Sequence, residues 1–482
     1  MSNLSELLPA GAGAKSASFV ASGTLGSGVT VALNSDGTVS AVAATNVSQS
    51  LGSRTSFNTG YATAYHSAVY DSANNKIVIS YQDQTTSSYG TSVVGTVSGT
   101  SISFGTPVVF ESANSSYISS TFDSTNNKVV IAYTDVGNSN YGTAVVGTVS
   151  GTSISFGTPV VFQSAAAYWN STIFDSNSNK VVVAYRGTSQ YGRAIVGTVS
   201  GTSISFGTPE VFEAADTQQV STTFDSNENK VVIAYRDGAN SNRGTAIVGT
   251  VSGTTISFGS AVVFETGSTA YISSTFDSNL GKVVITYQDA SNGFDGTAVV
   301  GTVSGTSISF GTPVVFETGA TYYPSVSYNS ASQSVVIAYQ DDGNSGYGTL
   351  IEGTVSGTSI TFGTPVVYTG TNPSNWMATA YDSDQKVVVA ASFYAIDEVS
   401  DARVWRTAYT ETNNTNFIGI TDQAIADTAT GAVIVQGGVS DKVTGLTTGS
   451  DYYVQTDGSL STTVSSVPAG RALSSTSILL EG

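Results

Sequence analysis

The sequence contains no cysteine, one histidine and two methionines among its 482 residues. Without cysteine, the chain can form neither a disulfide nor a thiolate metal site. The single histidine, His66, has no second imidazole with which to build a zinc cluster or a histidine-dependent catalytic relay. We therefore interpret His66 as a polar residue near the axis of the fold, and we assign no catalytic residue and no enzymatic activity.

Charged residues make up only 10% of the chain, and 34 acidic residues against 16 basic ones give a net charge of −18. Such a balance argues against nucleic-acid binding, which needs a basic face. The sequence has no apolar run long enough to span a membrane and no basic start followed by an apolar core. We expect no membrane insertion, and we expect synthesis in a cytoplasm without export by the general secretory route.

The chain is built from a unit of about fifty residues that returns almost letter for letter. The segment GTVSG begins at six positions that lie 50 or 52 residues apart: Gly95, Gly147, Gly197, Gly249, Gly301 and Gly353. A second marker, YDS or FDS before an apolar run, recurs in seven copies, one of them with asparagine: Asp71, Asp123, Asp175, Asp225, Asp277, Asn329 and Asp382. This period, about 52 residues, is typical of a β-propeller or a solenoid.

Each unit reads as four short strands. In the second unit they are expected at Ile118–Ser124, Lys128–Tyr133, Thr143–Ser150 and Ser153–Phe156, the last two joined by a two-residue turn that begins with glycine. The run KVVIAY is apolar on both faces, as in a strand covered on both sides, whereas SISF alternates and should be half exposed. Four such strands predict one blade of a propeller.

We favour a closed ring over an open solenoid, because an open array needs polar capping repeats and the last unit still carries YDS and KVVVAA. The fold class is therefore an all-β, seven-bladed β-propeller inserted in a small β domain that both termini build. The expected divisions are a flexible arm at 1–16, the two parts of the small domain at 17–46 and 421–482, and the propeller at 47–420. Either 46–57 or 411–421 could complete the last blade.

Two sets of turns differ in how they vary among the copies. The turns SGTS and DSxxNK hardly change, whereas the loops after the second strand and between blades vary and are rich in tyrosine, asparagine, serine and arginine. Such a composition suits an adaptable binding surface on which aromatic rings could stack on sugars; the alternative is drift of unconstrained loops. The candidate binding residues are Tyr89, Tyr117, Tyr141, Trp169, Tyr191, Arg193, Arg243, Tyr323, Tyr347 and Trp376.

Recurring acids have a structural interpretation and a functional one. The marker aspartates are expected to close a turn by accepting hydrogen bonds from backbone amides. A second series follows the second strand and could bind calcium weakly, although it lacks the spacing of an EF-hand loop: Asp83, Asp135, Asp237, Asp289 and Asp341. Acids that break the repeat could form a hydrolase pair, but solvated loop charges are commoner: Asp216, Glu352, Asp397, Glu398 and Asp401. We assign no metal-binding residue and no cofactor beyond this calcium possibility.

Three stretches carry a resemblance: FVASGTLGSGVTVALNSDGTVSAV, VVGTVSGTSISFGTPVVFES and GLTTGSDYYVQTDGSLSTT. They resemble tail-fibre or virion structural proteins of marine tailed phages, those of cyanobacteria in particular, over nearly the whole chain. The resemblance supplies no functional residues. It implies a protein of the virion exterior, assembled in the host cytoplasm in several copies beside other virion proteins.

From the resemblance and the variable loops together, we expect attachment to a host-surface glycan or protein through the variable face. The alternatives are a purely architectural capsid decoration or connector, and a glycan depolymerase.

Overall fold

The computed structural model describes residues 15–60, 63–370 and 372–481. Throughout these residues the regular structure consists of β-strands and short 3-10 turns, so the expected all-β, repeat-built fold is confirmed. No helix in this part of the chain is long and apolar enough to cross a membrane. The chain divides into a central unit, Gln49–Thr407, and a terminal unit formed by Met1–Ser48 together with Ala408–Gly482.

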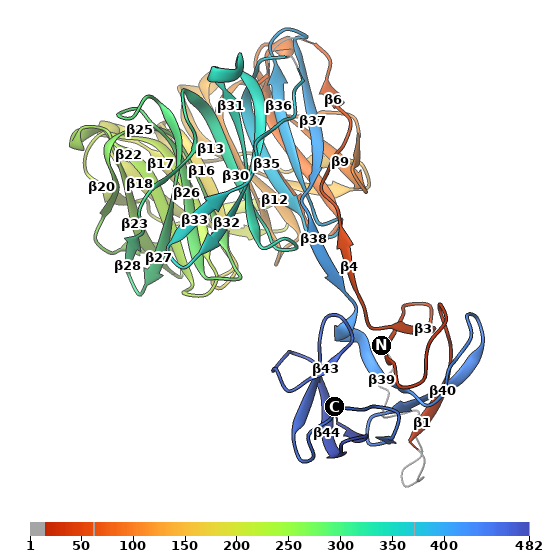
Figure 1. The fold of residues 1–482 in the computed structure, drawn as a ribbon. Coiled ribbons are helices and arrows are strands. Elements are labelled where there is room, and N and C mark those ends of the chain that lie inside the picture. The colour runs from red at the N-terminus through yellow and green to blue at the C-terminus, as the bar shows by residue number, and fades with distance from the viewer. Residues whose placement is uncertain (1–14, 61–62, 371, 482) are drawn as a thin grey trace. The chain divides into compact units, whose positions relative to one another are not determined.

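The described residues of the central unit form seven successive groups of four antiparallel strands, here called repeats 1 to 7. Figure 1 shows the strands of this unit packed beside one another. Within a repeat the strands pair in chain order and are called first to fourth. The first four repeats are β7 (Thr63–Asp71), β8 (Lys76–Asp83), β9 (Tyr89–Ser98), β10 (Ser101–Phe104); β11 (Val108–Asp123), β12 (Lys128–Asp135), β13 (Tyr141–Ser150), β14 (Ser153–Phe156); β16 (Tyr168–Asp175), β17 (Lys180–Arg186), β18 (Gly192–Ser200), β19 (Ser203–Phe206); β21 (Thr217–Asp225), β22 (Lys230–Asp237), β23 (Arg243–Ser252), β24 (Thr255–Phe258).

Repeats 5 and 6 follow the same order, and repeat 7 takes its fourth strand from the start of the unit. They are β25 (Val262–Asp277), β26 (Lys282–Asp289), β27 (Asp295–Ser304), β28 (Ser307–Phe310); β30 (Thr321–Asn329), β31 (Ser334–Asp341), β32 (Tyr347–Ser356), β33 (Ser359–Phe362); β35 (Ser374–Asp382), β36 (Val387–Tyr394), β37 (Val399–Arg406) and, from the start of the unit, β5 (Ser50–Leu51). Segments after the fourth strand return to the third strand as β15 (Val160–Ala166), β20 (Glu210–Glu213), β29 (Val314–Glu317) and β34 (Val366–Val367).

Burial within a repeat follows the sequence pattern. In the second strand β12, every side chain from Val129 to Tyr133 is fully buried, as expected for a strand covered on both faces. The fourth strand β14 alternates between exposed and buried positions. The hairpin between β13 and β14 places Gly151 at φ +60°, a left-handed backbone that glycine adopts at no steric cost.

The marker aspartates close the turn between the first and second strands, as predicted. Asp123 Oδ1 accepts from the backbone N–H groups of Thr125 at 3.0 Å and Asn126 at 2.9 Å. Asn329 does the same in repeat 6 with its amide oxygen. Because an amide oxygen serves as well as a carboxylate, the recurrence of aspartate reflects turn geometry.

Successive repeats contact each other through regions called seams here. At the seam between repeats 3 and 4, the Ser171 hydroxyl accepts from the backbone N–H of Thr222 at 2.9 Å. Gly157, which follows the fourth strand of repeat 2, packs so closely on repeat 3 that an added Cβ would lie 1.9 Å from the Thr202 carbonyl oxygen. The recurrence of serine in the first strand and of glycine after SISF therefore has a packing cause.

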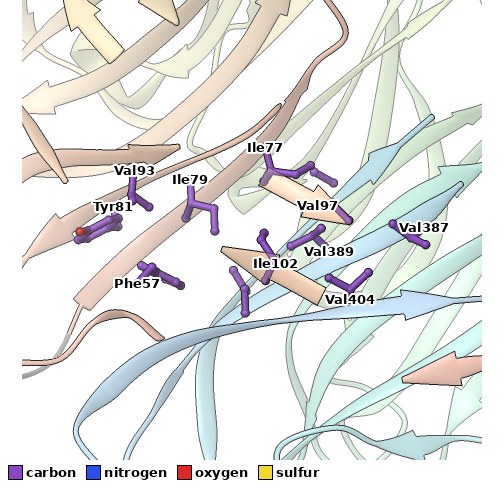
Figure 2. Close-up of a cluster of buried hydrophobic side chains, with 13 residues drawn as sticks. Phe57, Ile77, Ile79, Tyr81, Val93, Val97, Ile102, Val387, Val389 and Val404 are labelled. Atoms are coloured by element: carbon purple, nitrogen blue, oxygen red, sulfur yellow. The ribbon is translucent and has the colours of Figure 1, made fainter. Parts of the chain in front are cut away.

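The seam between repeats 7 and 1, called the closing seam, brings distant parts of the chain together. The first strands β35 and β7 lie against each other. Side chains of both repeats share one buried cluster, which includes Ile77, Ile79, Val387 and Val389 (Figure 2). Apolar burial of this kind contributes roughly 1.5–3 kcal/mol for each large side chain.

The N-terminal candidate supplies the strand that completes repeat 7. Leu51 of β5 pairs with Trp405, and β6 (Thr55–Asn58) pairs with the start of β37. The C-terminal candidate 411–421 pairs elsewhere, because β39 (Phe417–Thr421) hydrogen-bonds β2 and β40 of the terminal unit. The observed unit boundaries fall at 48/49 and 407/408. Residues 408–420, which the sequence analysis assigned to the propeller at 47–420, therefore belong to the terminal unit.

The terminal unit contains two five-stranded sheets and one strand pair, drawn from both ends of the chain. The strands are β1 (Ser16–Val20), β2 (Thr30–Leu33), β3 (Val39–Ala41), β4 (Ala44–Val47), β38 (Tyr409–Thr412), β39, β40 (Thr430–Val435), β41 (Val439–Ser440), β42 (Asp451–Val454), β43 (Leu460–Ser461), β44 (Pro468–Ser474) and β45 (Ser477–Leu480). Of the arm expected at 1–16, residues 1–14 lie outside the described residues, and Ser16 already begins β1.

Candidate binding site

Each first strand carries a bulge at the same place. In repeat 2 the pairing with β12 shifts between Ser116 and Ser119, so that Tyr117 and Ile118 fall between two register positions. Tyr117 has φ +49°, a left-handed backbone that is uncommon for a bulky residue and costs of order 1 kcal/mol or more. Bulges re-aim side chains, and backbone strain of this kind concentrates at functional sites.

The same bulge recurs in all seven repeats, and six of the seven residues that it re-aims are aromatic. We call this set the collar: Tyr65, Tyr117, Trp169, Gln219, Tyr271, Tyr323 and Trp376, with φ between +49° and +56°. Each lies six residues before the marker aspartate or asparagine of its repeat.

Collar side chains contact their neighbours around the central unit. Ring centroids are 5.0 Å apart for Tyr65–Tyr117 and 4.8 Å for Tyr117–Trp169. They are 4.8 Å apart for Tyr271–Tyr323, 5.0 Å for Tyr323–Trp376 and 4.6 Å for Trp376–Tyr65, the last pair crossing the closing seam. The chain of ring contacts is therefore interrupted at one member, Gln219.

Gln219 is held in place by the oxygen of its side-chain amide. Its Oε1 accepts a hydrogen bond from the backbone N–H of Tyr271 in the next repeat. A hollow of about 190 Å³ lies beside it, lined by Gln219, Trp169, Tyr271, Tyr323 and Trp376 and by the residue that follows the collar position in several repeats. A hollow that combines aromatic ring surface with an oriented polar group is typical of small-ligand sites.

The collar is electrically neutral near neutral pH. Burial, helped by the neighbouring Tyr323 hydroxyl, raises the pKa of Tyr271 to about 12. Burial also raises the pKa values of Tyr65, Tyr117 and Tyr323. Their hydroxyl groups therefore keep their protons and can both donate and accept hydrogen bonds.

His66 follows Tyr65 in the bulge of repeat 1 and is buried at the closing seam. Its Nε2 is hydrogen-bonded to the Thr63 hydroxyl, which lies 2.5 Å from that of Ser400 in repeat 7. Its ring packs against Phe57 and Tyr81. Burial lowers the pKa of His66 to about 3, so the imidazole is neutral.

The ten candidate residues separate into two groups. Four of them, Tyr117, Trp169, Tyr323 and Trp376, belong to the collar. The other six lie at or next to the start of a third strand, and they come from five different repeats. They are Tyr89, Tyr141, Tyr191 and Arg193 (both in repeat 3), Arg243 and Tyr347. The structure therefore brings only the first group together.

Sequence reasoning missed three collar residues, Tyr65, Gln219 and Tyr271. The constant offset of six residues from each marker would have found them. A comparison of loop composition among the copies could not identify these three residues, because it treated the collar positions as part of the variable loops between repeats.

Four of the five acids considered for calcium serve as caps of short 3-10 turns, and Asp289 accepts from the Ser291 backbone N–H in a turn of another kind. Asp135 Oδ1 accepts from the backbone N–H of Asn138 at 3.0 Å, at the start of η3 (Val136–Asn138). Asp237 and Asp341 make the same bond to Asn240 and Asn344. In the described part of the chain, no group of three or more acidic or histidine side chains is placed to hold a metal ion.

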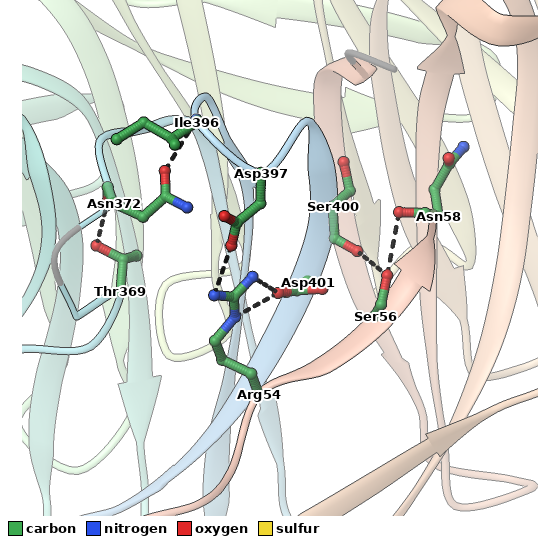
Figure 3. A network of polar contacts seen from close by, with 9 residues as sticks. All are labelled: Arg54, Ser56, Asn58, Thr369, Asn372, Ile396, Asp397, Ser400 and Asp401. Carbon is green, nitrogen blue, oxygen red and sulfur yellow. Dashed lines mark hydrogen bonds and ion pairs between the residues drawn. The ribbon is translucent and has the colours of Figure 1, made fainter. Parts of the chain in front are cut away.

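Two of the acids considered for hydrolysis are paired with one arginine. Arg54 Nη1 lies 2.8 Å from Asp397, and its Nη2 lies 2.5 Å from Asp401 (Figure 3). The guanidinium also lies 4.1 Å from the centre of the Tyr394 ring. Burial alone would lower the pKa of Arg54, but its bonds to the two carboxylates raise it overall. Both carboxylates therefore have a structural partner at the edge of repeat 7.

No protein-family model and no curated protein sequence matches the chain. Among solved structures, it is similar to the BP39L lectin from Burkholderia pseudomallei, with a TM-score of 0.54 and 12% identity over 73% of this chain and 98% of the lectin chain. It is also similar to a protein of unknown function from Dyadobacter fermentans, with a TM-score of 0.43 and 10% identity over 76% of this chain and 99% of the other. At these identities the lectin shows a shared fold only, and the second likeness carries no argument.

Proposed function

We propose that the central unit is a seven-bladed β-propeller whose blades are repeats 1 to 7. Three observations support this architecture: the pairing of four strands in order, the contact of each first strand with the next, and the contact between β35 and β7. Planes of neighbouring collar rings also differ by 40–60°. A seven-fold rotation around a central channel would give about 51°.

We further propose that the protein is an exterior virion protein of a tailed phage that attaches to a host-surface glycan. The collar is the observation that carries this function, because six strained backbone positions present aromatic rings and four of these rings line one hollow. Aromatic rings offer flat apolar faces, which suit the C–H face of a sugar, and tyrosine hydroxyls can bond its hydroxyl groups. The likeness to a lectin supports the same reading at the level of fold.

The collar binds without covalent chemistry in this proposal. A single small site of this kind is expected to be weak, because few groups touch the ligand. Several copies on one particle would raise the overall affinity, since each binding event after the first takes place at a high effective concentration. Attachment therefore depends on both the collar and the copy number.

The test is a glycan array and a host-cell binding assay with the purified chain. We expect Trp169→Gly to weaken binding at least tenfold, since it removes a collar ring while glycine keeps the left-handed backbone. Tyr141→Ser, at the start of a third strand, is the matched control and should bind like the wild type. If neither the array nor host cells bind the wild-type chain, the attachment function is wrong and the architectural alternative replaces it.

A further inference from the structure

We propose that each chain binds one pyranose residue on the axis of the collar, and that Gln219 orients it. This inference rests on the proposed function and names the ligand class and the number of sites. The ring contacts of the collar run in one series from Tyr271 round to Trp169 with an interruption at Gln219, and one hollow lies beside that interruption. Seven repeats therefore share a single site.

The size of the collar favours one sugar ring. Seven positions with neighbours 4.6–5.0 Å apart, if evenly spaced, lie on a circle of radius about 5.5 Å. Carbon atoms in contact are about 3.5–4.0 Å apart, and the collar rings themselves occupy part of this circle, so two sugar rings side by side do not fit inside it. A hollow of about 190 Å³ is also small for a ligand site and suits one monosaccharide.

Gln219 breaks the seven-fold equivalence of the collar and gives the site a direction. Its Oε1 is fixed by the Tyr271 backbone N–H, and within the described residues no hydrogen bond is made by its Nε2. Two N–H donors are thus available beside the hollow, at the one position without an aromatic ring. They can donate to a hydroxyl or ring oxygen of the sugar and so fix its rotation about the axis.

The variable loops at the third-strand starts do not provide an alternative set of repeated sites. The residue at this position is tyrosine in four repeats, Arg243 in repeat 4 and Asp295 in repeat 5. Side chains of opposite charge would not recognise the same group. A site in the collar predicts one bound ligand per chain, whereas sites in the loops would predict seven. The measured stoichiometry therefore distinguishes a collar site from loop sites.

The experiment is a calorimetric titration of the full chain with the methyl pyranosides of the sugars selected on the glycan array. We expect one bound ligand per chain and a change in tryptophan fluorescence, because two of the three tryptophans, Trp169 and Trp376, are collar residues while Trp405 is 2% exposed. Gln219→Glu keeps the oxygen that bonds Tyr271 but replaces the donors, and should weaken binding about tenfold.

Gln163→Glu is the matched control, because Glu111, Glu213, Glu265 and Glu317 stand at that position in other repeats. Should Gln219→Glu fold poorly by thermal melting, Gln219→Asn, a residue that tolerates the left-handed backbone, is expected to show the same loss. Binding of several ligands per chain, or full affinity in both Gln219 variants, overturns the axial site while leaving glycan attachment standing. Absence of any array binding overturns the proposed function as well.

Discussion

Seams between consecutive repeats use the same few residues, whereas the closing seam is assembled from segments far apart in the chain. Consecutive repeats are joined by a serine hydroxyl and a close-packed glycine. At the closing seam Ala378 occupies the serine position, and the polar contacts include His66, Thr63 and Ser400. Arg54 and Asp401, which tie the N-terminal segment to repeat 7, are 347 residues apart in sequence. The closing seam keeps the close-packed glycine, because an added Cβ on Gly52 would lie 1.8 Å from the Thr100 carbonyl oxygen. The comparison therefore shows that the glycine contact is shared by both kinds of seam, while the serine contact is replaced at the closing seam by residues that the other repeats do not carry at those positions.

The largest effect is expected from breaking the charged pair that ties the N-terminal segment to β37 of repeat 7. Arg54→Ala leaves Asp401, whose side chain is 3% exposed, without its partner. Removing one partner of a buried pair is strongly destabilising, and we expect a loss of about 3 kcal/mol in the free energy of unfolding, measured by urea denaturation. Lys76→Ala, which removes a lysine at the start of β8, is the control for loss of positive charge. Equal stability of both variants would show that the pair does not hold the N-terminal segment on repeat 7.

A slightly smaller loss is expected at a regular seam. Gly157→Ala places a methyl group 1.9 Å from the Thr202 carbonyl oxygen, so the backbone must shift, at a cost of about 2.5 kcal/mol. Gly363 follows the fourth strand of repeat 6, and the nearest atom to its added Cβ is 3.7 Å away. Gly363→Ala should therefore be nearly neutral. Thermal melts of the two variants measure the difference, and similar melting temperatures would contradict close packing at this seam.

The closing seam is also expected to be sensitive to acid. His66 has a pKa of about 3 when folded and about 6.5 when unfolded, so the unfolded chain takes up the proton first. The stability that depends on neutral His66 is fully present above pH 6.5 and is lost as the pH falls toward 3. Between pH 7 and pH 5 the wild type should lose about 2 kcal/mol more than His66→Asn, measured by urea denaturation at both values. Parallel losses in the two proteins would assign the acid sensitivity to other groups.

The smallest effect is expected from the serine hydroxyls. Ser171→Ala leaves the Thr222 N–H without its acceptor and should cost about 1 kcal/mol. The reverse change at the closing seam, Ala378→Ser, adds a hydroxyl at the position where the other repeats carry serine and should stabilise slightly. Denaturation midpoints of the pair compare the two kinds of seam directly. A destabilising Ala378→Ser would show that the closing seam differs in backbone spacing and not only in its side chains.

Much of the central unit could be predicted because its pattern is repeated and local. The run from Val129 to Tyr133 identifies a strand covered on both faces, and Gly151 identifies the hairpin that follows the next strand. The closing strand could not be chosen from sequence, since β5 is only Ser50–Leu51 and carries no alternation. Its place is decided by pairing with Trp405 and Arg406 at the other end of the unit.

The collar could be predicted only in part for a different reason. Aromatic residues in variable connections indicated a binding surface, and Tyr117, Trp169, Tyr323 and Trp376 were among them. What gathers these residues is a left-handed backbone at a bulge, a conformation that propensity does not assign to tyrosine or tryptophan. Gln219 could not be recognised as a site residue from the sequence, because its role depends on its being the non-aromatic member of the collar, and the collar is visible only in the structure.

Insertion of the central unit between 48/49 and 407/408 has a mechanical consequence. Under the proposed attachment, tension applied to a ligand in the collar leaves the central unit through two covalent crossings, which share the load. A protease that cuts one crossing leaves the two units tethered by the other. A particle that carried this protein in the proposed role would therefore stay attached to its ligand after a single cleavage, whereas a domain attached by one linker would be lost.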